Sequence, residues 1–150
     1  MTAPPSLTQP IELVTDGSTT LGASTLASLP TRERTFEIVC ASGDRYAAVW
    51  AGVPIVALLE HASVPPETTH LLVESDVGYR VCVPITRALE GLLAFARDGE
   101  TLATLERFDT RFVGPEIGGP KAVKDVVRLE TATLPPGADP DSYEELWPEE

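Results

Sequence analysis

Lysine is scarce in this sequence: only two of its 150 residues, Lys121 and Lys124, are lysines. With 23 Asp and Glu against 11 Lys and Arg, the formal net charge is −12. A chain this poor in positive charge repels phosphate backbones and anionic lipid surfaces, which argues against nucleic acid and membrane surfaces as its main partners. An acid-rich surface with few lysines also points to a salt-loving host, because halophiles use a net charge far from zero.

Cysteine and long apolar runs are scarce as well. Cys40 and Cys82 are the only two cysteines, so no disulfide framework is expected, although a single bridge between them stays open. Residues 1–10 lack the basic and apolar regions of a signal peptide. The longest apolar run, 47–59, is short of the ~20 residues that span a bilayer. We therefore expect a cytoplasmic protein without a membrane span.

The apolar residues that are present suffice for one core. They make up 43% of the chain, and a single domain usually serves ~100–200 residues. The composition divides the chain into a loose lead-in (1–10), one domain (11–132) and an acidic, proline-rich tail (133–150). We expect the tail to be disordered or loosely docked.

Short apolar stretches separated by turn residues predict an α+β domain of layered mixed β-sheets with a few short helices. An Asp98-Gly99 turn predicts a hairpin between 92–96 and 101–105. The other strands are expected at 11–14, 35–40, 45–50, 70–74, 79–84 and 122–131, and the helices at 21–29, 55–62 and 85–89.

Cys40 is a candidate metal ligand, because it ends an alternating strand just before a turn and a thiolate suits soft metals. The alternative is a small buried hydrophobic residue, and this is the favoured interpretation of Cys82 in the middle of a strand. His61 and His70 lack the spacing of a zinc site. A cysteine-dependent enzyme or a zinc protein stays open as a weaker alternative.

The loop that holds both lysines is the second candidate site. Gly118 and Gly119 precede Lys121 and Lys124, and successive backbone N–H groups in such a loop can bind an anion beside a lysine. Arg111 lies a few residues upstream. The alternative is a solvated loop with two surface lysines, and the spacing does not match a Walker motif.

Six segments, taken in order, resemble the molybdopterin-binding domain of the sulfite oxidase family over roughly residues 11–132. The Trp-x-Gly-Val-Pro stretch that begins at Trp50 is the most specific of them, and the spacing resembles the compact, stand-alone form seen in methionine-sulfoxide reductase catalytic subunits. The segments are TFEIVC (35–40), WAGVPIVALLEHA (50–62), ESDVGYRVCVPI (74–85), LLAFARDGETL (92–102), TRFVGP (110–115) and GGPKAVKDVVRLE (118–130).

The resemblance implies that Cys40 supplies the protein thiolate to molybdenum and is the catalytic and metal residue. It also implies that Arg111, Lys121 and Lys124, with the glycines before them, bind the molybdenum–molybdopterin cofactor near its phosphate. The implied fold is the family's α+β arrangement of layered sheets. The chain departs from the compact form at Asp44, which stands where that form often has tryptophan.

Two functions follow from this resemblance. The first is a small molybdopterin-dependent oxidoreductase that transfers an oxygen atom to or from a small sulfite- or sulfoxide-type substrate. It would need an external electron-transfer partner, because the sequence has no heme or iron–sulfur motif. The second is a non-catalytic binding or accessory domain that keeps the fold but holds cofactor weakly or not at all. The altered surroundings of Cys40 favour the second.

Overall fold

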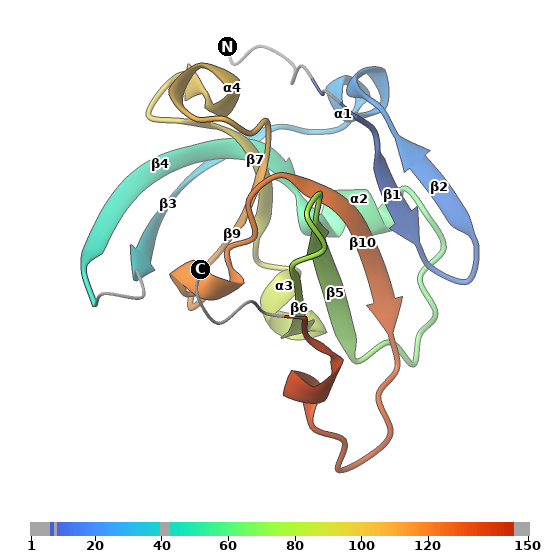
Figure 1. The fold of residues 1–150 in the computed structure, drawn as a ribbon. Helices are drawn as coiled ribbons and strands as arrows, with labels where there is room; N and C mark the ends of the chain where they lie inside the picture. Colours follow the sequence, from blue (N-terminus) through green and yellow to red (C-terminus); the bar gives the residue numbers. More distant parts are fainter. Residues whose placement is uncertain (1–6, 8, 40–42, 146–150) are drawn as a thin grey trace.

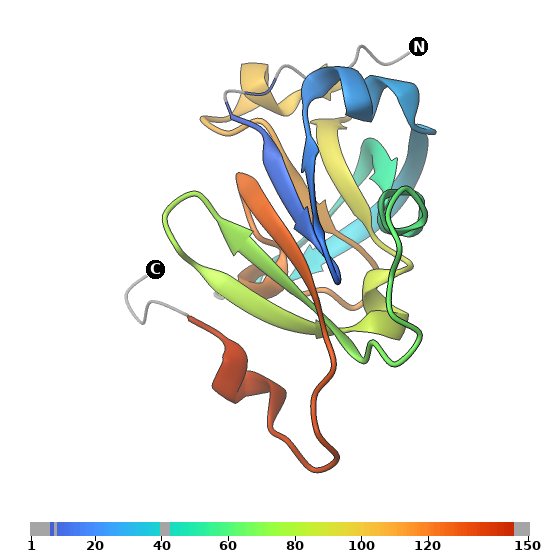
Figure 2. The same cartoon turned by 90° about the vertical axis from the view of Figure 1, so that its right-hand side faces the viewer.

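The fold consists of two β-sheets with short helices at their ends, as Figures 1 and 2 show in two views. The computed structural model describes residues 7, 9–39 and 43–145. This mixed arrangement of sheets and short helices confirms the α+β fold class expected from the sequence. None of the helices in these described ranges is long and apolar enough to cross a membrane.

The first sheet has five strands in the order β2-β1-β10-β5-β6. It is mixed, because β1 runs parallel to β10 while the other neighbours are antiparallel. Its edge strand β6 lies next to the C-terminal segment (Figure 1). The strands are β1 (Ile11–Val14), β2 (Ser18–Leu21), β5 (His70–Ser75), β6 (Arg80–Pro84) and β10 (Val126–Ala132).

The second sheet is antiparallel, with the order β3-β4-β7-β8 and with β9 paired to β7. The β3–β4 pairing extends to Val39 and Arg45. The strands are β3 (Arg32–Val39), β4 (Arg45–Pro54), β7 (Leu92–Arg97), β8 (Glu100–Thr101) and β9 (Arg111–Val113).

Over the described ranges, five short helical segments connect these strands and a sixth follows β10. Pro54 directly precedes the second of them, where its fixed φ favours the start of a helix. They are α1 (Ala23–Ser28), α2 (Ile55–Glu60), α3 (Ile85–Ala88), α4 (Leu102–Leu105) and the two 3₁₀ turns η1 (Gly119–Lys121) and η2 (Pro140–Tyr143).

One apolar core fills the space between the sheets. Alternation along β3 buries Phe36 and Ile38, while every residue of β7 from Leu92 to Ala96 is buried, so both faces of this strand are covered. Trp50 of β4 is fully buried in the same core. The two sheets therefore fold as one unit around shared apolar side chains.

Gly52 explains part of the Trp-x-Gly-Val-Pro motif. The β4–β7 pairing shifts register between Ala51 and Gly52, and a Cβ added at Gly52 would overlap the carbonyl oxygen of Leu93. Only glycine allows the two backbones to approach this closely.

Most of the expected elements are present, with three differences. Strand β2 was not expected, because Ser18–Leu21 is mostly polar and lies at the edge of its sheet. The second arm of the predicted hairpin has only two strand residues before the chain turns into α4. The tail, expected to be disordered or loosely docked, forms backbone hydrogen bonds with β6 at Glu145.

Candidate functional site

The candidate site begins at the end of β3, where the chain reaches Cys40. Cys40 itself lies outside the described residues, so its proposed role stays a prediction. The residue before it, Val39, lies next to the glycine loop, since a Cβ added at Gly118 would be 4.0 Å from the Val39 carbonyl oxygen. The fold thus brings the strand that leads to Cys40 beside the loop that carries Lys121.

Arg111 connects this loop to β4. Its side chain is 7% exposed, and its guanidinium donates through Nε to the Ala122 carbonyl at 2.9 Å and through Nη1 to the Tyr46 hydroxyl at 3.1 Å. It also lies over the Trp50 ring, 6.0 Å from the centroid. Among the described residues, Arg111 forms no ion pair with a carboxylate, and its side-chain contacts are with neutral groups.

A pocket of about 260 Å³ lies between β6, α3 and the glycine loop. Its lining includes two cationic side chains, those of Lys121 and Arg87, and the residue Gly118. Arg87 is exposed and has no ion pair with the described part of the chain. The full lining is Cys82, Val83, Pro84, Arg87, Glu116, Ile117, Gly118 and Lys121.

Lys121 is occupied by the C-terminal segment. Its Nζ lies 2.5 Å from Oε2 of Glu144 and 3.8 Å from Oδ1 of Asp141. The same Glu144 oxygen accepts a hydrogen bond from the backbone N–H of Cys82 at 2.9 Å. A cation and a backbone N–H therefore converge on one carboxylate, as they would on any small anion.

The groups around this contact are those of a buried, acid-lined environment. Burial, and then the charge of Glu144, raises the pKa of the Cys82 thiol. The same two causes raise the pKa of Tyr79, whose hydroxyl donates to the Pro120 carbonyl. Cys82 is a free, buried thiol, which agrees with its interpretation as a packing residue.

Two backbone N–H groups of the glycine loop are bonded within the turn η1. Those of Lys121 and Ala122 donate to the carbonyl of Gly118, and Ala122 also donates to the Gly119 carbonyl. The N–H groups of Gly118 and Gly119 are not among these donors, and the role of these two glycines in binding an anion stays a prediction. The loop also offers an anion the Lys121 side chain.

Lys124 lies apart from the pocket lining. Its side chain is exposed, with Nζ 5.8 Å from the centroid of the Phe108 ring, and its backbone forms a β-bridge with Arg111. His70 contacts Thr69 through Nδ1. Over the described ranges, no group of three His, Cys, Asp or Glu side chains could hold a metal ion.

Three residues that contact or line the candidate site were not predicted from the sequence. They are Tyr46, Arg87 and Glu144. Tyr46 and Glu144 are 65 and 23 residues from the partners that they contact, and no spacing rule relates them. Arg87 follows a short apolar helix start and looks like an ordinary surface arginine. The scarcity of lysine and the family resemblance both pointed toward Lys121 and, through it, toward this region.

A comparison with known protein families shows the family to which this chain belongs. The family described as "Oxidoreductase molybdopterin binding domain" matches residues 8–138. The chain belongs to this family. The match confirms the resemblance seen in the ordered segments, and molybdopterin is the cofactor that the family description names.

A solved structure of similar fold supports the same architecture. The sulfane dehydrogenase SoxCD from Paracoccus pantotrophus superposes with a TM-score of 0.76 at 22% sequence identity. The match covers 87% of this chain but 39% of the SoxCD chain, so this chain spans well under half of that relative. A comparison with curated protein sequences finds no match.

The residues present fit the anionic part of a molybdopterin cofactor. The pocket offers Lys121 and Arg87 as cations, and Cys82 offers a backbone N–H that already binds a carboxylate. Such a donor set suits a phosphate group. Arg111 does not line this pocket and is a separate buried cation, without an ion pair to a described carboxylate.

Proposed function

We propose that this chain is a small molybdopterin-dependent oxidoreductase domain that transfers an oxygen atom, with Cys40 as the protein ligand to molybdenum. The observation that carries the proposal is the family match across residues 8–138. It is supported by the convergence of Arg111, Gly118 and Lys121 near the end of β3, one residue before Cys40. Bound molybdenum would supply the two-electron oxygen-atom transfer.

The protein's own residues would then bind the cofactor and orient the substrate. Lys121 and Arg87 would hold the phosphate of the cofactor at the pocket. Arg111, fixed by Ala122 and Tyr46, would present a buried positive charge to a small sulfite- or sulfoxide-type substrate. Because burial lowers the effective dielectric constant, this charge attracts an anion more strongly than a surface arginine would. An external protein partner would accept the two electrons released when sulfite is oxidised, or supply the two electrons needed when a sulfoxide is reduced.

The first test is metal content. In chain produced in a cofactor-competent host at high salt, we expect about one molybdenum per chain by mass spectrometry. We expect Cys40→Ser to lose the thiolate-to-metal absorption, because a serine oxygen is a harder ligand. Folded protein from such a host that contains no molybdenum would contradict the proposal.

Cys82→Ser is the matched control, since it removes the other thiol. It should keep the thiolate-to-metal absorption, because burial raises the pKa of the Cys82 thiol and disfavours its thiolate form. Loss of the absorption in Cys82→Ser and its persistence in Cys40→Ser would reassign the metal ligand.

A second candidate function is an accessory domain that holds cofactor weakly. The observation in its favour is the ion pair between Lys121 and Glu144, which neutralises a predicted cofactor-binding lysine. Reproducible reduction of a sulfoxide, or oxidation of sulfite, with an artificial electron carrier would rule this candidate out.

A further inference from the structure

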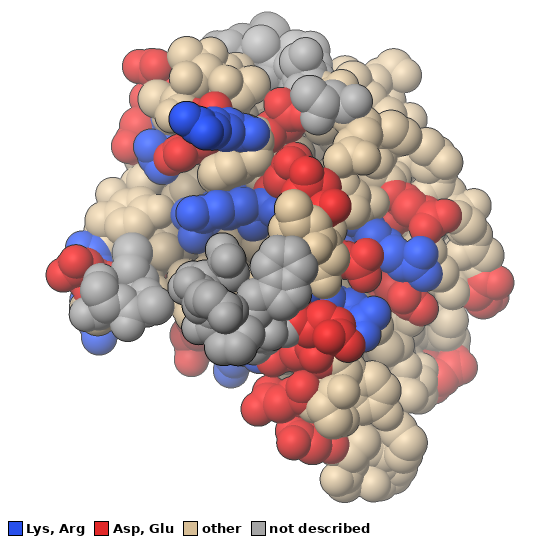
Figure 3. All heavy atoms as spheres, in the orientation of Figure 1, with Lys and Arg blue, Asp and Glu red and all other residues tan. Residues whose placement is uncertain are grey.

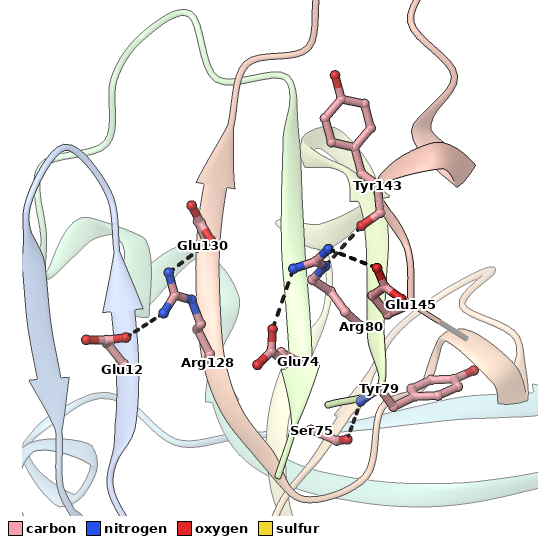
Figure 4. Close-up of polar contacts among 9 residues, drawn as sticks. All are labelled: Glu12, Glu74, Ser75, Tyr79, Arg80, Arg128, Glu130, Tyr143 and Glu145. Atoms are coloured by element: carbon pink, nitrogen blue, oxygen red, sulfur yellow. Dashed lines mark hydrogen bonds and ion pairs between the residues drawn. The ribbon is translucent and has the colours of Figure 1, made fainter. Parts of the chain in front are cut away.

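The C-terminal segment is fixed to the edge of the first sheet. After β10 the chain passes through η2 and returns to β6, where Arg80 and Glu145 exchange two backbone hydrogen bonds of 3.0 and 2.9 Å. The Arg80 side chain donates through Nε to the Tyr143 carbonyl and lies between Glu74 and Glu145, as Figure 4 shows. These contacts place the residue between Tyr143 and Glu145 against Lys121 and Cys82, two residues that line the pocket.

That residue is Glu144. Its carboxylate receives the kinds of contact that a binding site makes with an anion. Its side chain is 4% exposed, although its carboxylate carries a charge. Burial of a charge is unfavourable unless the charge is paired, and here Lys121 and the Cys82 N–H supply the pairing. Glu144 is thus unlike Glu145, whose side chain is 67% exposed and which pairs only at 3.8 Å with Arg80.

The two groups that hold Glu144 belong to residues that line the pocket. Lys121 and Cys82 lie beside Gly118 and Arg87 there. The Tyr79 hydroxyl donates to the Pro120 carbonyl and fixes the turn that presents Lys121. Figure 3 shows acidic side chains gathered around the C-terminal segment, with basic side chains close to them. A ligand phosphate that used Lys121 would meet the Glu144 carboxylate at the same nitrogen.

We propose that Glu144 is an intramolecular substitute for a phosphate group, and that the C-terminal segment must release Lys121 before a phosphate-bearing ligand can bind there. The identity of that ligand as the pterin cofactor rests on the proposed function. The competition itself rests only on the contacts of Glu144. By linkage, a ligand that takes Lys121 weakens the docking of the segment to the same extent.

The probe for the test is inorganic phosphate, titrated into the full chain by calorimetry. Glu144→Gln removes the competing charge, and Glu144→Ala also removes the side chain that blocks the nitrogen. We expect both to raise the affinity for phosphate about tenfold, within the usual range of coupling between two sites. Lys121→Gln added to either variant should abolish the gain. No gain in either single variant would overturn the proposal.

Glu145→Gln is the matched control, because it removes the same charge from the next residue of the same segment but from a carboxylate that pairs with Arg80. It should leave the affinity for phosphate within about twofold, since an exposed pair at 3.8 Å contributes little. An equal gain in Glu145→Gln would show that net charge, not occupation of Lys121, is what matters, and would also overturn the proposal.

A second arm separates the cofactor phosphate from free phosphate. Pterin content is measured on the parent chain and on Glu144→Gln, both produced in a cofactor-competent host. We expect more pterin per chain in the variant. A gain for inorganic phosphate without any pterin in either protein leaves the competition standing and contradicts the proposed function. Pterin in both proteins, without a gain for phosphate, contradicts the competition alone.

Discussion

Two arginines of this protein, one on each sheet, lie in opposite surroundings. On the first sheet, Arg128 pairs with Glu12 at 2.9 Å and with Glu130 at 3.2 Å, and its side chain is 39% exposed (Figure 4). On the second sheet, Arg111 is 7% exposed and contacts a carbonyl, a hydroxyl and an aromatic ring. One arginine has carboxylates and water around it, while the other has neither a described carboxylate nor much solvent.

The difference shows which positive charge is available to a ligand. Exposed ion pairs contribute little to stability, and their charges are already neutralised. A buried cation that is held by neutral acceptors keeps its field, and its geometry is fixed by the core around it. The second sheet is also where the backbones approach closely at Gly52. The second sheet thus fixes the position of Arg111, while the first sheet supplies the edge to which the C-terminal segment docks.

The largest effect is expected at Gly52. Gly52→Ala places a Cβ against the Leu93 carbonyl, so β4 and β7 must separate. We expect a loss of about 4 kcal/mol in the free energy of unfolding, measured in urea. Gly17→Ala, in the β1–β2 turn of the first sheet, meets nothing within 4 Å and should change it by less than about 0.5 kcal/mol. Equal losses of stability in Gly52→Ala and Gly17→Ala would show that the close approach of β4 and β7 at Gly52 does not constrain the second sheet.

The next effect tests the two arginines directly. Arg111→Ala leaves the Ala122 carbonyl without its donor and opens a cavity beside Trp50, so we expect a loss of about 3 kcal/mol. Arg128→Ala removes two exposed ion pairs and should lose less than about 1 kcal/mol. Urea unfolding of both variants measures the difference.

Arg111→Lys separates charge from hydrogen bonding at the same position. It keeps the positive charge but cannot reproduce the Nε and Nη1 contacts together, so its stability should fall between those of the parent and Arg111→Ala. If Arg111→Ala were as stable as Arg128→Ala, the contrast between a buried and an exposed arginine would be wrong.

Local sequence signals predicted most of the fold. Alternation along Phe36 and Ile38 gave β3, Pro54 marked the start of α2, and Asp98-Gly99 marked a hairpin turn in which both residues adopt positive φ. Each of these signals depends on neighbours within a few residues. The exposed edge strand β2 has no such apolar pattern, and so it was missed.

The site was predicted only in part, because its contacts join distant parts of the chain. Arg111 and Lys121 were found through the resemblance and the scarcity of lysine. Glu144 was not, since a carboxylate in an acidic tail looks like solvated surface until the fold brings it to Lys121. The acceptors of Arg111 were equally invisible, because the pairing of β3 with β4 decides where Tyr46 lies.

The smallest effect concerns Asp125, which joins the two sheets. Its backbone N–H donates to the Thr110 carbonyl beside β9, and its carbonyl accepts from the Asp76 N–H at the end of β5. Burial, and then the charge of Asp76, raises the pKa of the Asp125 carboxyl from 3.8 to about 6. The junction between the sheets therefore contains carboxylates that repel each other near neutral pH.

Because the pKa of Asp125 is higher in the folded protein, the folded state binds more protons than the unfolded state between about pH 4 and 6. Stability from this group is thus present at low pH and is lost as the pH rises through 6. Asp125→Asn removes the loss, and at pH 7 we expect it to raise the free energy of unfolding by about 1 kcal/mol, a value reduced for partial solvent screening. Asp98→Asn makes the same change at another residue with positive φ and controls for the backbone. A pH dependence between 4 and 6 that is identical in the parent and Asp125→Asn would show that the sheets meet without this electrostatic strain.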